Sequence, residues 1–209
     1  MTITTIDRLP AELARGHGGG GPAPVRTVVA YGFWIFILSD IVMFSALFAA
    51  YAVLSGNTAG GPDGRELFNL RNVFIETACL LFSSYTCGLG MLSAERREPG
   101  RFLLFAVFTF ALGAAFLFIE MSEFAGMVRA GAGPSRSAFL SSFFSLVGMH
   151  GAHVTAGLVW LVYMMAQVLA KGLRAVVLRR LVCFSLFWHA LDIIWVWLFT
   201  VVYLMGARP

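Results

Sequence analysis

Five apolar blocks, separated by short polar connections, take up most of this chain of 209 residues. They run over residues 31–54, 73–94, 102–128, 138–169 and 182–205. Each block is long enough to cross the hydrocarbon core of a bilayer, which takes about 20 residues in a helix. Because lipid offers the backbone no hydrogen-bond partners, such segments cross as helices. The sequence therefore predicts an all-α integral membrane protein, a bundle of five transmembrane helices.

The composition excludes a soluble domain and a disordered chain. Hydrophobic residues make up 59% of the sequence and charged residues 12%, whereas soluble domains are about half apolar and about a quarter charged. The 15 Lys and Arg residues are spread over loops and tails, with no basic run interleaved with aromatic residues. We therefore predict no nucleic-acid partner. The three cysteines lie in apolar blocks without CxxC spacing, where a free cysteine behaves as a small hydrophobe.

The polar segments predict the domain organisation and the orientation. Residues 1–30 are rich in Gly and Pro and predict a flexible tail, followed by a membrane domain over residues 31–206. The tail and the connections 95–101 and 170–181 hold ten of the basic residues, and the opposite side holds five. Since basic residues accumulate in cytoplasmic loops, we predict a cytoplasmic N-terminus and a periplasmic C-terminus.

Ionisable side chains inside the apolar blocks are the most informative feature of the sequence. They are Asp40, Glu76, Glu120, Glu123, His150, His153, His189 and Asp192. No Lys or Arg lies inside a predicted span. An ionisable group in a bilayer costs about 3 kcal/mol or more and usually faces protein or water. We predict that these side chains serve helix packing, lipid binding or proton support. We predict no catalytic, cofactor-binding or metal-binding residue in this chain.

The depth of each group predicts which of them meet. At about 1.5 Å per residue, Asp40 and His189 lie roughly 10–14 Å from the cytoplasmic ends of their helices. We predict a contact between Asp40 and His189, with His153 as the alternative partner. Asp192 lies at a similar depth, so these groups could meet in the inner half of the bilayer. The glutamates lie near outer helix ends, where water could reach them.

Two side-chain pairs at spacing three leave functional alternatives open. His150 and His153 share a helix face and with His189 could bind a metal, but hydrogen bonding between helices is the favoured interpretation. Glu120 and Glu123 could hold a proton or a cation, although capping and hydration at a helix end is favoured. Asp40 could have a functional or assembly role, or could be only a satisfied buried acid.

Small and aromatic residues in the last two blocks predict packing. Gly148, Ala152 and Ala156 are spaced by four and would let a neighbouring helix approach closely. Trp188, Trp195 and Trp197 are expected to pack or anchor rather than to bind a cofactor.

Several motifs resemble the haem–copper oxidase subunit III family. Residues 148–157 (GMHGAHVTAG) resemble its HG-x-HV-x-x-G signature, and residues 187–195 (FWHALDIIW) resemble its WHF-x-D-x-x-W segment. Residues 31–40 (YGFWIFILSD) resemble the family helix that carries an acid after Ser, where cytochrome c oxidase members often have Glu. The presence of five spans, and residues 57–62 (NTAGGP) and 201–206 (VVYLMG), resemble the quinol oxidase branch.

The resemblance implies a function that composition and spacing do not give. Family members are non-catalytic subunits that pack against the catalytic subunit I, with subunits II and IV in the complex. The complex oxidises ubiquinol, reduces oxygen to water and pumps protons in the bacterial inner membrane. Its haem and copper belong to the partner catalytic subunit, and subunit III holds phospholipid. The alternatives are subunit III of a cytochrome c oxidase and a stand-alone ion or solute transporter. A transporter would show broken helices or paired half-repeats, which the sequence lacks.

Overall fold

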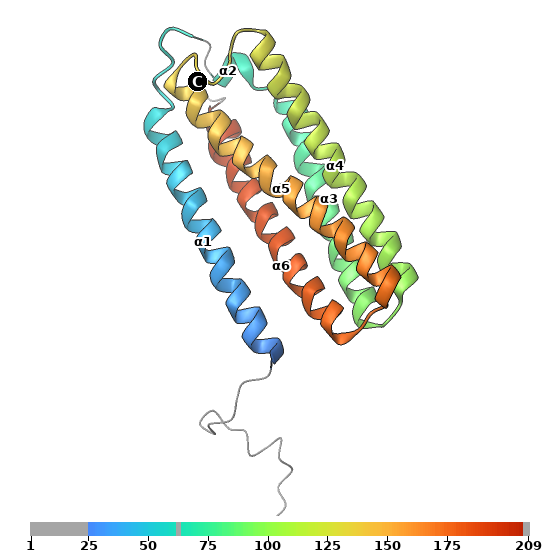
Figure 1. Cartoon of the computed structure of the whole chain (residues 1–209). Helices are drawn as coiled ribbons and strands as arrows, with labels where there is room; N and C mark the ends of the chain where they lie inside the picture. Colours follow the sequence, from blue (N-terminus) through green and yellow to red (C-terminus); the bar gives the residue numbers. More distant parts are fainter. Residues whose placement is uncertain (1–24, 62–63, 207–209) are drawn as a thin grey trace, which may run out of the picture.

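The structure, a computed structural model, describes residues 25–61 and 64–206. Figure 1 shows long helices running up and down. The elements are α1 (Val25–Leu54), α2 (Gly64–Leu67), α3 (Leu70–Glu95), α4 (Pro99–Arg129), α5 (Ala138–Lys171), α6 (Ala175–Leu198) and the π-helix η1 (Phe199–Leu204). Five spans, the last of them formed by α6 and η1 together, are long and apolar enough to cross a membrane. The prediction of an all-α chain with five spans is confirmed.

The helices extend beyond the predicted apolar blocks. α1 begins at Val25 rather than at residue 31, so the last residues of the predicted tail are helical. Residues 1–24 of that tail lie outside the described residues. α6 begins at Ala175 rather than at residue 182. Arg179 and Arg180 lie in its first turns. Hydropathy locates the part of a helix in hydrocarbon, whereas the helix itself continues into the headgroup layer.

Local sequence signals set the helix ends. The Asn69 side chain accepts a hydrogen bond from the Arg71 amide at the start of α3, and Ser137 does the same for Leu140 in α5. α4 begins at Pro99, whose missing N–H is not needed in a first turn. α5 ends at Gly172, whose φ of +67° lies in the left-handed region that glycine adopts without strain.

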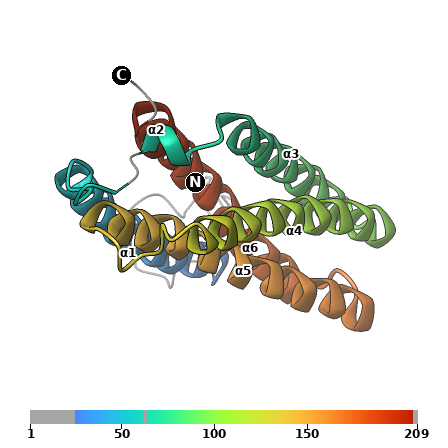
Figure 2. The ribbon, with the colours of Figure 1, turned by 90° about the horizontal axis from the view of Figure 1, so that it is seen from above.

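Four spans form the body of the bundle, and α1 lies along its side. α3 packs on α4, α5 packs on both α4 and α6, and α6 also packs on α3. α1 contacts α5 and α6, which separate it from α3 and α4 (Figures 1 and 2). The N-terminal end of the bundle holds the start of α1 and the α3–α4 and α5–α6 connections (Figure 1). The C-terminal end holds α2, the α4–α5 connection and the end of η1.

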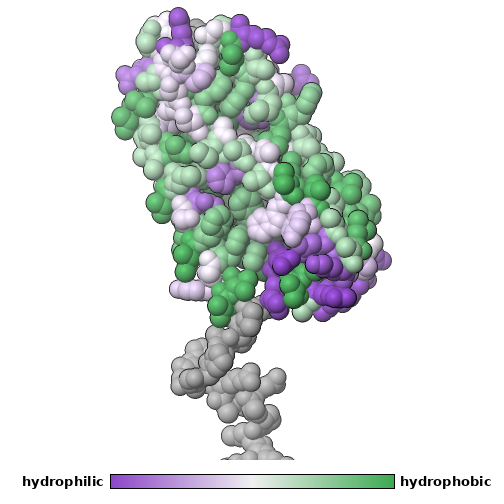
Figure 3. All heavy atoms as spheres, viewed as in Figure 1, coloured by the Kyte–Doolittle hydropathy of each residue, from purple (hydrophilic) through white to green (hydrophobic). Residues whose placement is uncertain are grey.

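A narrow seam joins α1 to the other helices. Its buried residues are Ile37, Phe44 and Tyr51, spaced by seven. A spacing of seven keeps one stripe of a helix turned toward its neighbours. The rest of α1 carries apolar side chains on the outside of the chain. Figure 3 shows apolar side chains over most of the height of the molecule and polar ones gathered toward its ends, as a membrane-spanning bundle requires.

Two glycines let helices approach closely at Trp188, away from most of the predicted stripe of small residues. A Cβ added at Gly157 of α5 would lie 2.8 Å from the Trp188 ring, and one added at Gly113 of α4 would lie 3.1 Å from it. Both glycines therefore make room for the indole. Ala152 and Ala156 of the predicted stripe are exposed on the outside of α5. The spacing of these small residues predicted a face for helix packing, but it could not predict whether the partner helix belongs to this chain.

Candidate functional site

The ionisable side chains of the spans fall into separate places rather than one site. Asp40 and His153 lie between α1 and α5. His189 and Asp192 of α6 lie against Ser84 of α3. The glutamates lie between α3 and α4 near the C-terminal end of the bundle. Of the groups predicted to meet in one half of the bilayer, Asp40 and His153 do meet. The prediction is wrong for His189 and Asp192, because α6 turns both of them toward α3.

Asp40 and His153 form a polar contact between α1 and the bundle. Asp40 Oδ1 lies 4.0 Å from His153 Nε2, and about a fifth of each side chain is exposed (17% and 19%). The other ring nitrogen of His153 lies 2.8 Å from the Met149 carbonyl of its own helix. The distance to Asp40 is too long for a direct hydrogen bond. It is short enough for an attraction if the imidazole is protonated.

His189 has a partner other than the predicted one. Its Nδ1 lies 2.5 Å from the Ser84 hydroxyl of α3, and Asp192, one turn further along α6, also lies beside Ser84. The predicted contact between Asp40 and His189 is therefore wrong, and the alternative contact with His153 is the one that forms. Depth along two helices does not determine which faces are turned toward each other.

His150 lies in an aromatic enclosure. It is 0% exposed, and its ring centroid lies 5.2 Å from that of Trp195, 5.9 Å from Phe116 and 6.3 Å from Phe44. Neither ring nitrogen has a hydrogen-bond partner among the side chains and backbone that the structure describes. The predicted role of His150 as a hydrogen-bonding contact between helices is therefore wrong in this chain. The ring instead packs between α1, α4 and α6.

Two tryptophans link α6 to α3 through hydroxyl groups that the sequence analysis did not single out. The Trp188 indole N–H donates to Ser83 Oγ at 3.1 Å, and the Trp195 indole N–H donates to Thr77 Oγ1 at 3.0 Å. Ser84 bonds to His189 on the same side of α3. Thr77 and Ser84 of α3 are spaced by seven, as are Trp188 and Trp195 of α6. Because a spacing of seven keeps side chains on one stripe of a helix, it is the signal that would have indicated this interface.

The glutamate cluster consists of Glu76 of α3, Glu120 and Glu123 of α4, and Tyr203 of η1. Glu76 and Glu120 are 0% and 1% exposed, Tyr203 is 1% exposed, and Glu123 is half-buried. Glu76 interacts electrostatically with both α4 glutamates. The prediction of hydrated carboxylates at open helix ends is wrong for Glu76 and Glu120, because both side chains are buried inside the bundle. The sequence analysis missed Tyr203.

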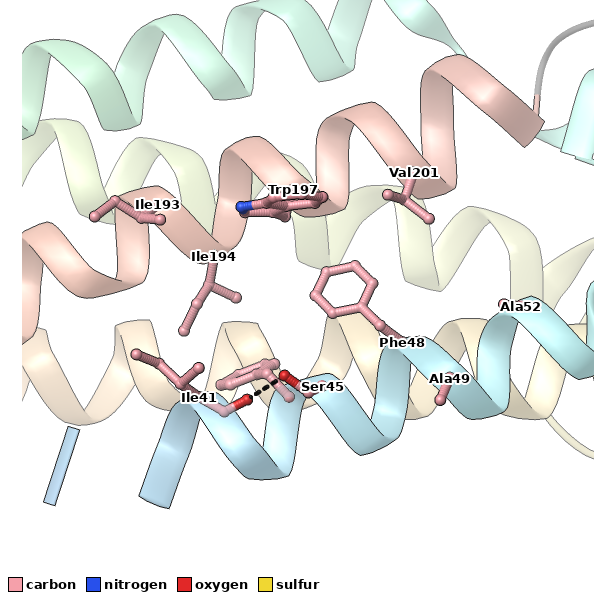
Figure 4. Close-up of a pocket in the computed structure, with 10 residues that line it drawn as sticks. Ile41, Ser45, Phe48, Ala49, Ala52, Ile193, Ile194, Trp197 and Val201 are labelled. Atoms are coloured by element: carbon pink, nitrogen blue, oxygen red, sulfur yellow. Dashed lines mark hydrogen bonds between the residues drawn. The ribbon is translucent and has the colours of Figure 1, made fainter. Parts of the chain in front are cut away.

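An apolar groove of about 600 Å³ runs between α1 and the last span. Figure 4 shows α1 side chains facing α6 and η1 across it. The residues lining it are Ile41, Phe44, Ser45, Phe48, Ala49, Ala52, Ile193, Ile194, Trp197 and Val201. The Ser45 hydroxyl donates to the Ile41 carbonyl of its own helix at 2.8 Å, so the one hydroxyl in the lining is already bonded. The groove therefore suits a hydrocarbon chain.

The three membrane histidines face different neighbours. His153 faces α1, His189 faces α3, and His150 is enclosed by aromatic rings. Over the described part of the chain, no group of three or more His, Cys, Asp or Glu side chains is arranged to hold a metal ion. The alternative of a metal site built from these histidines therefore has no geometric support.

Residues 14–207 match the family described as Cytochrome c oxidase subunit III. The chain belongs to this family. The match includes all five spans and every polar group described above. The subunit III motifs quoted from the sequence lie on α1, α5 and α6, where they supply Asp40, His153, Trp188 and His189. The resemblance to the family is confirmed.

Curated relatives within the subunit III family match over most of their length. The chain is 55% identical over 191 residues to the cytochrome bo(3) ubiquinol oxidase subunit 3 of Pseudomonas aeruginosa, covering 91% of this chain and 88% of the relative. It is 48% identical to the protein of the same name from Pseudomonas putida, covering 84% and 85%. It is 43% identical to the quinol oxidase subunit 3 of Bacillus subtilis, covering 84% and 86%.

Proposed function

We propose that this chain is subunit III of a terminal quinol oxidase in the bacterial inner membrane. The observation that carries the proposal is its 55% identity to a ubiquinol oxidase subunit 3 across 91% of the chain. The five spans and the subunit III motifs on three helices agree with it. The complex would oxidise ubiquinol, reduce oxygen to water and pump protons. The cytochrome c oxidase alternative is disfavoured, because the relatives reported above are all quinol oxidase subunits.

The chain acts in this complex as a non-catalytic subunit, with haem and copper held by the catalytic subunit I. Support comes from the positions of the membrane histidines. Histidine is the residue best suited to ligate haem iron or copper, but each of these histidines contacts other side chains of the bundle instead. His153 is engaged with Asp40, and His189 with Ser84. His150 is packed against Trp195 and Phe116. Each histidine thus contributes to helix packing.

Subunit I is the main partner, and subunits II and IV complete the complex. The outer faces of the helices support lateral assembly, because many large apolar side chains of α1 and α4 point away from the bundle. Ala152 and Ala156 also face outward from α5, and small residues allow another helix to approach closely. These faces would contact partner subunits or membrane lipid.

Phospholipid is the proposed occupant of the groove between α1 and the last span. About 600 Å³ of apolar space accommodates hydrocarbon. No charged side chain lines the groove, so the acyl chains would bind there and the headgroup would lie beyond its end. Lipid would then fill the gap beside the narrow seam of α1.

The proposed orientation places the N-terminal end of the bundle in the cytoplasm. The α3–α4 and α5–α6 connections share this end and carry Arg96, Arg97 and Arg174. Reporter fusions after residue 60 and after residue 173 test it. The first should report the periplasm and the second the cytoplasm, and an exchange of the two results would refute the orientation.

Purification in mild detergent followed by optical spectroscopy tests the proposed function. A tagged chain should bring down a complex with haem absorbance, and the separated polypeptide should carry neither haem nor copper. His150→Asn and His153→Asn should leave the haem content of the complex unchanged. Haem or copper retained on the separated polypeptide, or purification of the chain as a lone and active transporter, would contradict the proposal.

A further inference from the structure

Four polar side chains converge between α3, α4 and η1 without the partners that burial requires. Both carboxyl oxygens of Glu76 and of Glu120, one of Glu123, and the hydroxyl of Tyr203 are buried and lack a hydrogen bond among the described residues. In folded proteins most buried polar atoms have a partner, which is either protein or ordered water. A concentration of exceptions in one place needs an explanation.

The four groups lie within electrostatic range of one another. Glu76 interacts electrostatically with Glu120 and Glu123. The Tyr203 hydroxyl interacts with all three carboxyl groups, and more weakly with Tyr51 of α1. Tyr203 is 1% exposed and its hydroxyl is buried, so the hydroxyl lies inside the bundle rather than at its surface.

Over the described side chains, no Lys or Arg forms an ion pair with these carboxyl groups. Among the side chains that the structure describes, the ion pairs are Arg101–Glu98 and His153–Asp40. Neither pair includes a member of the glutamate cluster. Burying one unpaired carboxylate is strongly unfavourable, and burying several next to one another adds their repulsion. A proton on a carboxyl group removes both costs and also supplies a hydrogen-bond donor.

The backbone that carries Tyr203 is also unusual. Residues 199–204 form a π-helix that continues α6 and packs against α3. Single π-helical turns inside α-helices occur frequently at functional sites. Here the π-helix brings Tyr203 against Phe68, which follows α2, with ring centroids 4.9 Å apart. This contact packs Tyr203 against the segment that joins α2 to α3.

We propose that the glutamate cluster is a proton-binding site, in which the carboxyl groups share at least one proton and are bridged by water. The carboxyl groups act as both donors and acceptors, and the Tyr203 hydroxyl donates to one of them. The bridging water satisfies the remaining lone pairs. Glu123 is the half-buried member and lies beside Asn72 near the start of α3. It is therefore the member through which a proton exchanges with the aqueous phase.

A proton fits the site better than a metal cation. The three carboxyl groups are not arranged as the ligands of a metal ion in the described structure. A hard cation such as Ca²⁺ takes six to eight oxygen ligands at fixed short distances. A shared proton requires only hydrogen-bond distances bridged by water. The other titratable group facing the site from α3 is Cys79, which interacts with Glu76.

Infrared difference spectroscopy of the purified complex tests the proposal. At neutral pH the complex should show the C=O band of protonated carboxyl groups, shifted in D₂O. Glu76→Gln or Glu120→Gln should remove a component of this band, and Tyr203→Phe should shift it because a hydrogen bond to the carboxyl group is lost. Glu98→Gln is the matched control, because Glu98 is exposed at the opposite end of the bundle and should leave the band unchanged.

Two further measurements test the proposal even if a Gln variant fails to assemble. If a Gln variant does not assemble, Glu76→Asp or Glu120→Asp keeps the carboxyl group and should move its band rather than remove it. Titration calorimetry with Na⁺ and with Ca²⁺ should show no binding that depends on Glu120. An unchanged band in both Gln variants would show that the carboxyl groups are ionised and overturn the proposal. Cation binding abolished by Glu120→Gln would overturn it in favour of a metal site.

Discussion

α1 and α6 are both apolar helices of the same bundle, yet far fewer residues of α1 than of α6 are buried inside the chain. In the most apolar stretch of each span, 11% of the residues of α1 are buried inside the chain, compared with 56% for the last span. α6 contacts α1, α3 and α5. Hydropathy does not distinguish the two helices, since both qualify as membrane spans. The two helices differ in how much of their surface packs against other helices of the chain.

The comparison separates stability within the chain from assembly with other components. α6 carries Trp188 and Trp195, which pack between helices and donate hydrogen bonds to α3. α1 meets the bundle only along its seam of Ile37, Phe44 and Tyr51. Substitutions in α6 should therefore unfold the subunit, whereas substitutions on the outer face of α1 should change what binds to it.

The largest expected effect is at the tryptophans of the two helices. Trp188→Ala removes a ring that is 1% exposed together with its bond to Ser83, and should lower the free energy of unfolding by about 3–5 kcal/mol. Trp34→Ala on α1, where the ring is 49% exposed, should change it by less than about 0.5 kcal/mol. Denaturation of the solubilised subunit in mixed micelles measures both values.

The same pair of variants can also sharpen the comparison. Retention of each variant in the whole complex should be measured beside its stability. Trp34→Ala, with unchanged unfolding but weaker retention, would assign the outer face of α1 to a partner subunit. Equal destabilisation by the two substitutions would show that α1 belongs to the folded core after all.

Glycine substitutions give the second contrast. In Gly157→Ala the new Cβ would lie 2.8 Å from the Trp188 ring, a distance that forces a shift and should destabilise the subunit by about 1–3 kcal/mol. Gly32→Ala on α1 meets nothing within 4 Å and should stabilise the helix by up to about 1 kcal/mol. Opposite signs in the same denaturation assay are expected, and a destabilising Gly32→Ala would contradict the open position of α1.

The sequence predicted those features that depend on one helix at a time. Length and hydropathy located all five spans, and the cost of burying charge indicated the polar residues that matter. Motif spacing was sufficient to place the chain in its family. Each of these properties is read along a single segment, so no knowledge of its neighbours was needed.

The features that the sequence missed depend on how helices face each other. Depth placed Asp40 and His189 at the same level, but α6 turns His189 toward Ser84 of α3. Likewise, the glutamates were placed near helix ends, where water is expected. Glu76 and Glu120 are instead buried, as is Tyr203 of η1. A π-helix such as η1 leaves no pattern in the hydropathy of the sequence. Asp40 lies three residues after Ile37 of the α1 seam. An analysis of the spacing of seven would therefore have predicted that Asp40 faces the bundle, but not whether its neighbour is α5 or α6.

The polar contact of α1 gives the third prediction. Asp40→Leu removes the group facing His153 at 4.0 Å and should weaken the attachment of α1 by about 1–2 kcal/mol. Asp40→Asn removes the charge but keeps a polar side chain of the same shape beside His153, so it should weaken the attachment less than Asp40→Leu does. Quantitative retention of the subunit in detergent measures both variants.

A double-mutant cycle with His153→Asn identifies the partner of Asp40. The effects of Asp40→Leu and His153→Asn should be less than additive, whereas Asp40→Leu and His189→Asn should add, because His189 bonds to α3. Additive effects in the first pair would refute the assigned contact. Loss of a proton-linked activity in an assembled Asp40→Asn complex would show a role for Asp40 beyond packing.

The smallest expected effect comes from single hydroxyl groups on the two sides of the comparison. Thr77→Val removes the acceptor of the Trp195 N–H while keeping the shape of the side chain, and bonds between membrane helices contribute about 0.6 kcal/mol on average. Ser45→Ala on α1 removes a hydroxyl that bonds only to the Ile41 carbonyl of its own helix, so no contact between helices is lost. We expect a measurable loss of stability for Thr77→Val and none for Ser45→Ala. The Trp195 fluorescence should also change in Thr77→Val, because its indole N–H loses a defined partner. Equal stability of the two variants with unchanged fluorescence would show that the hydrogen bond between Trp195 and Thr77 does not contribute to the stability of the subunit.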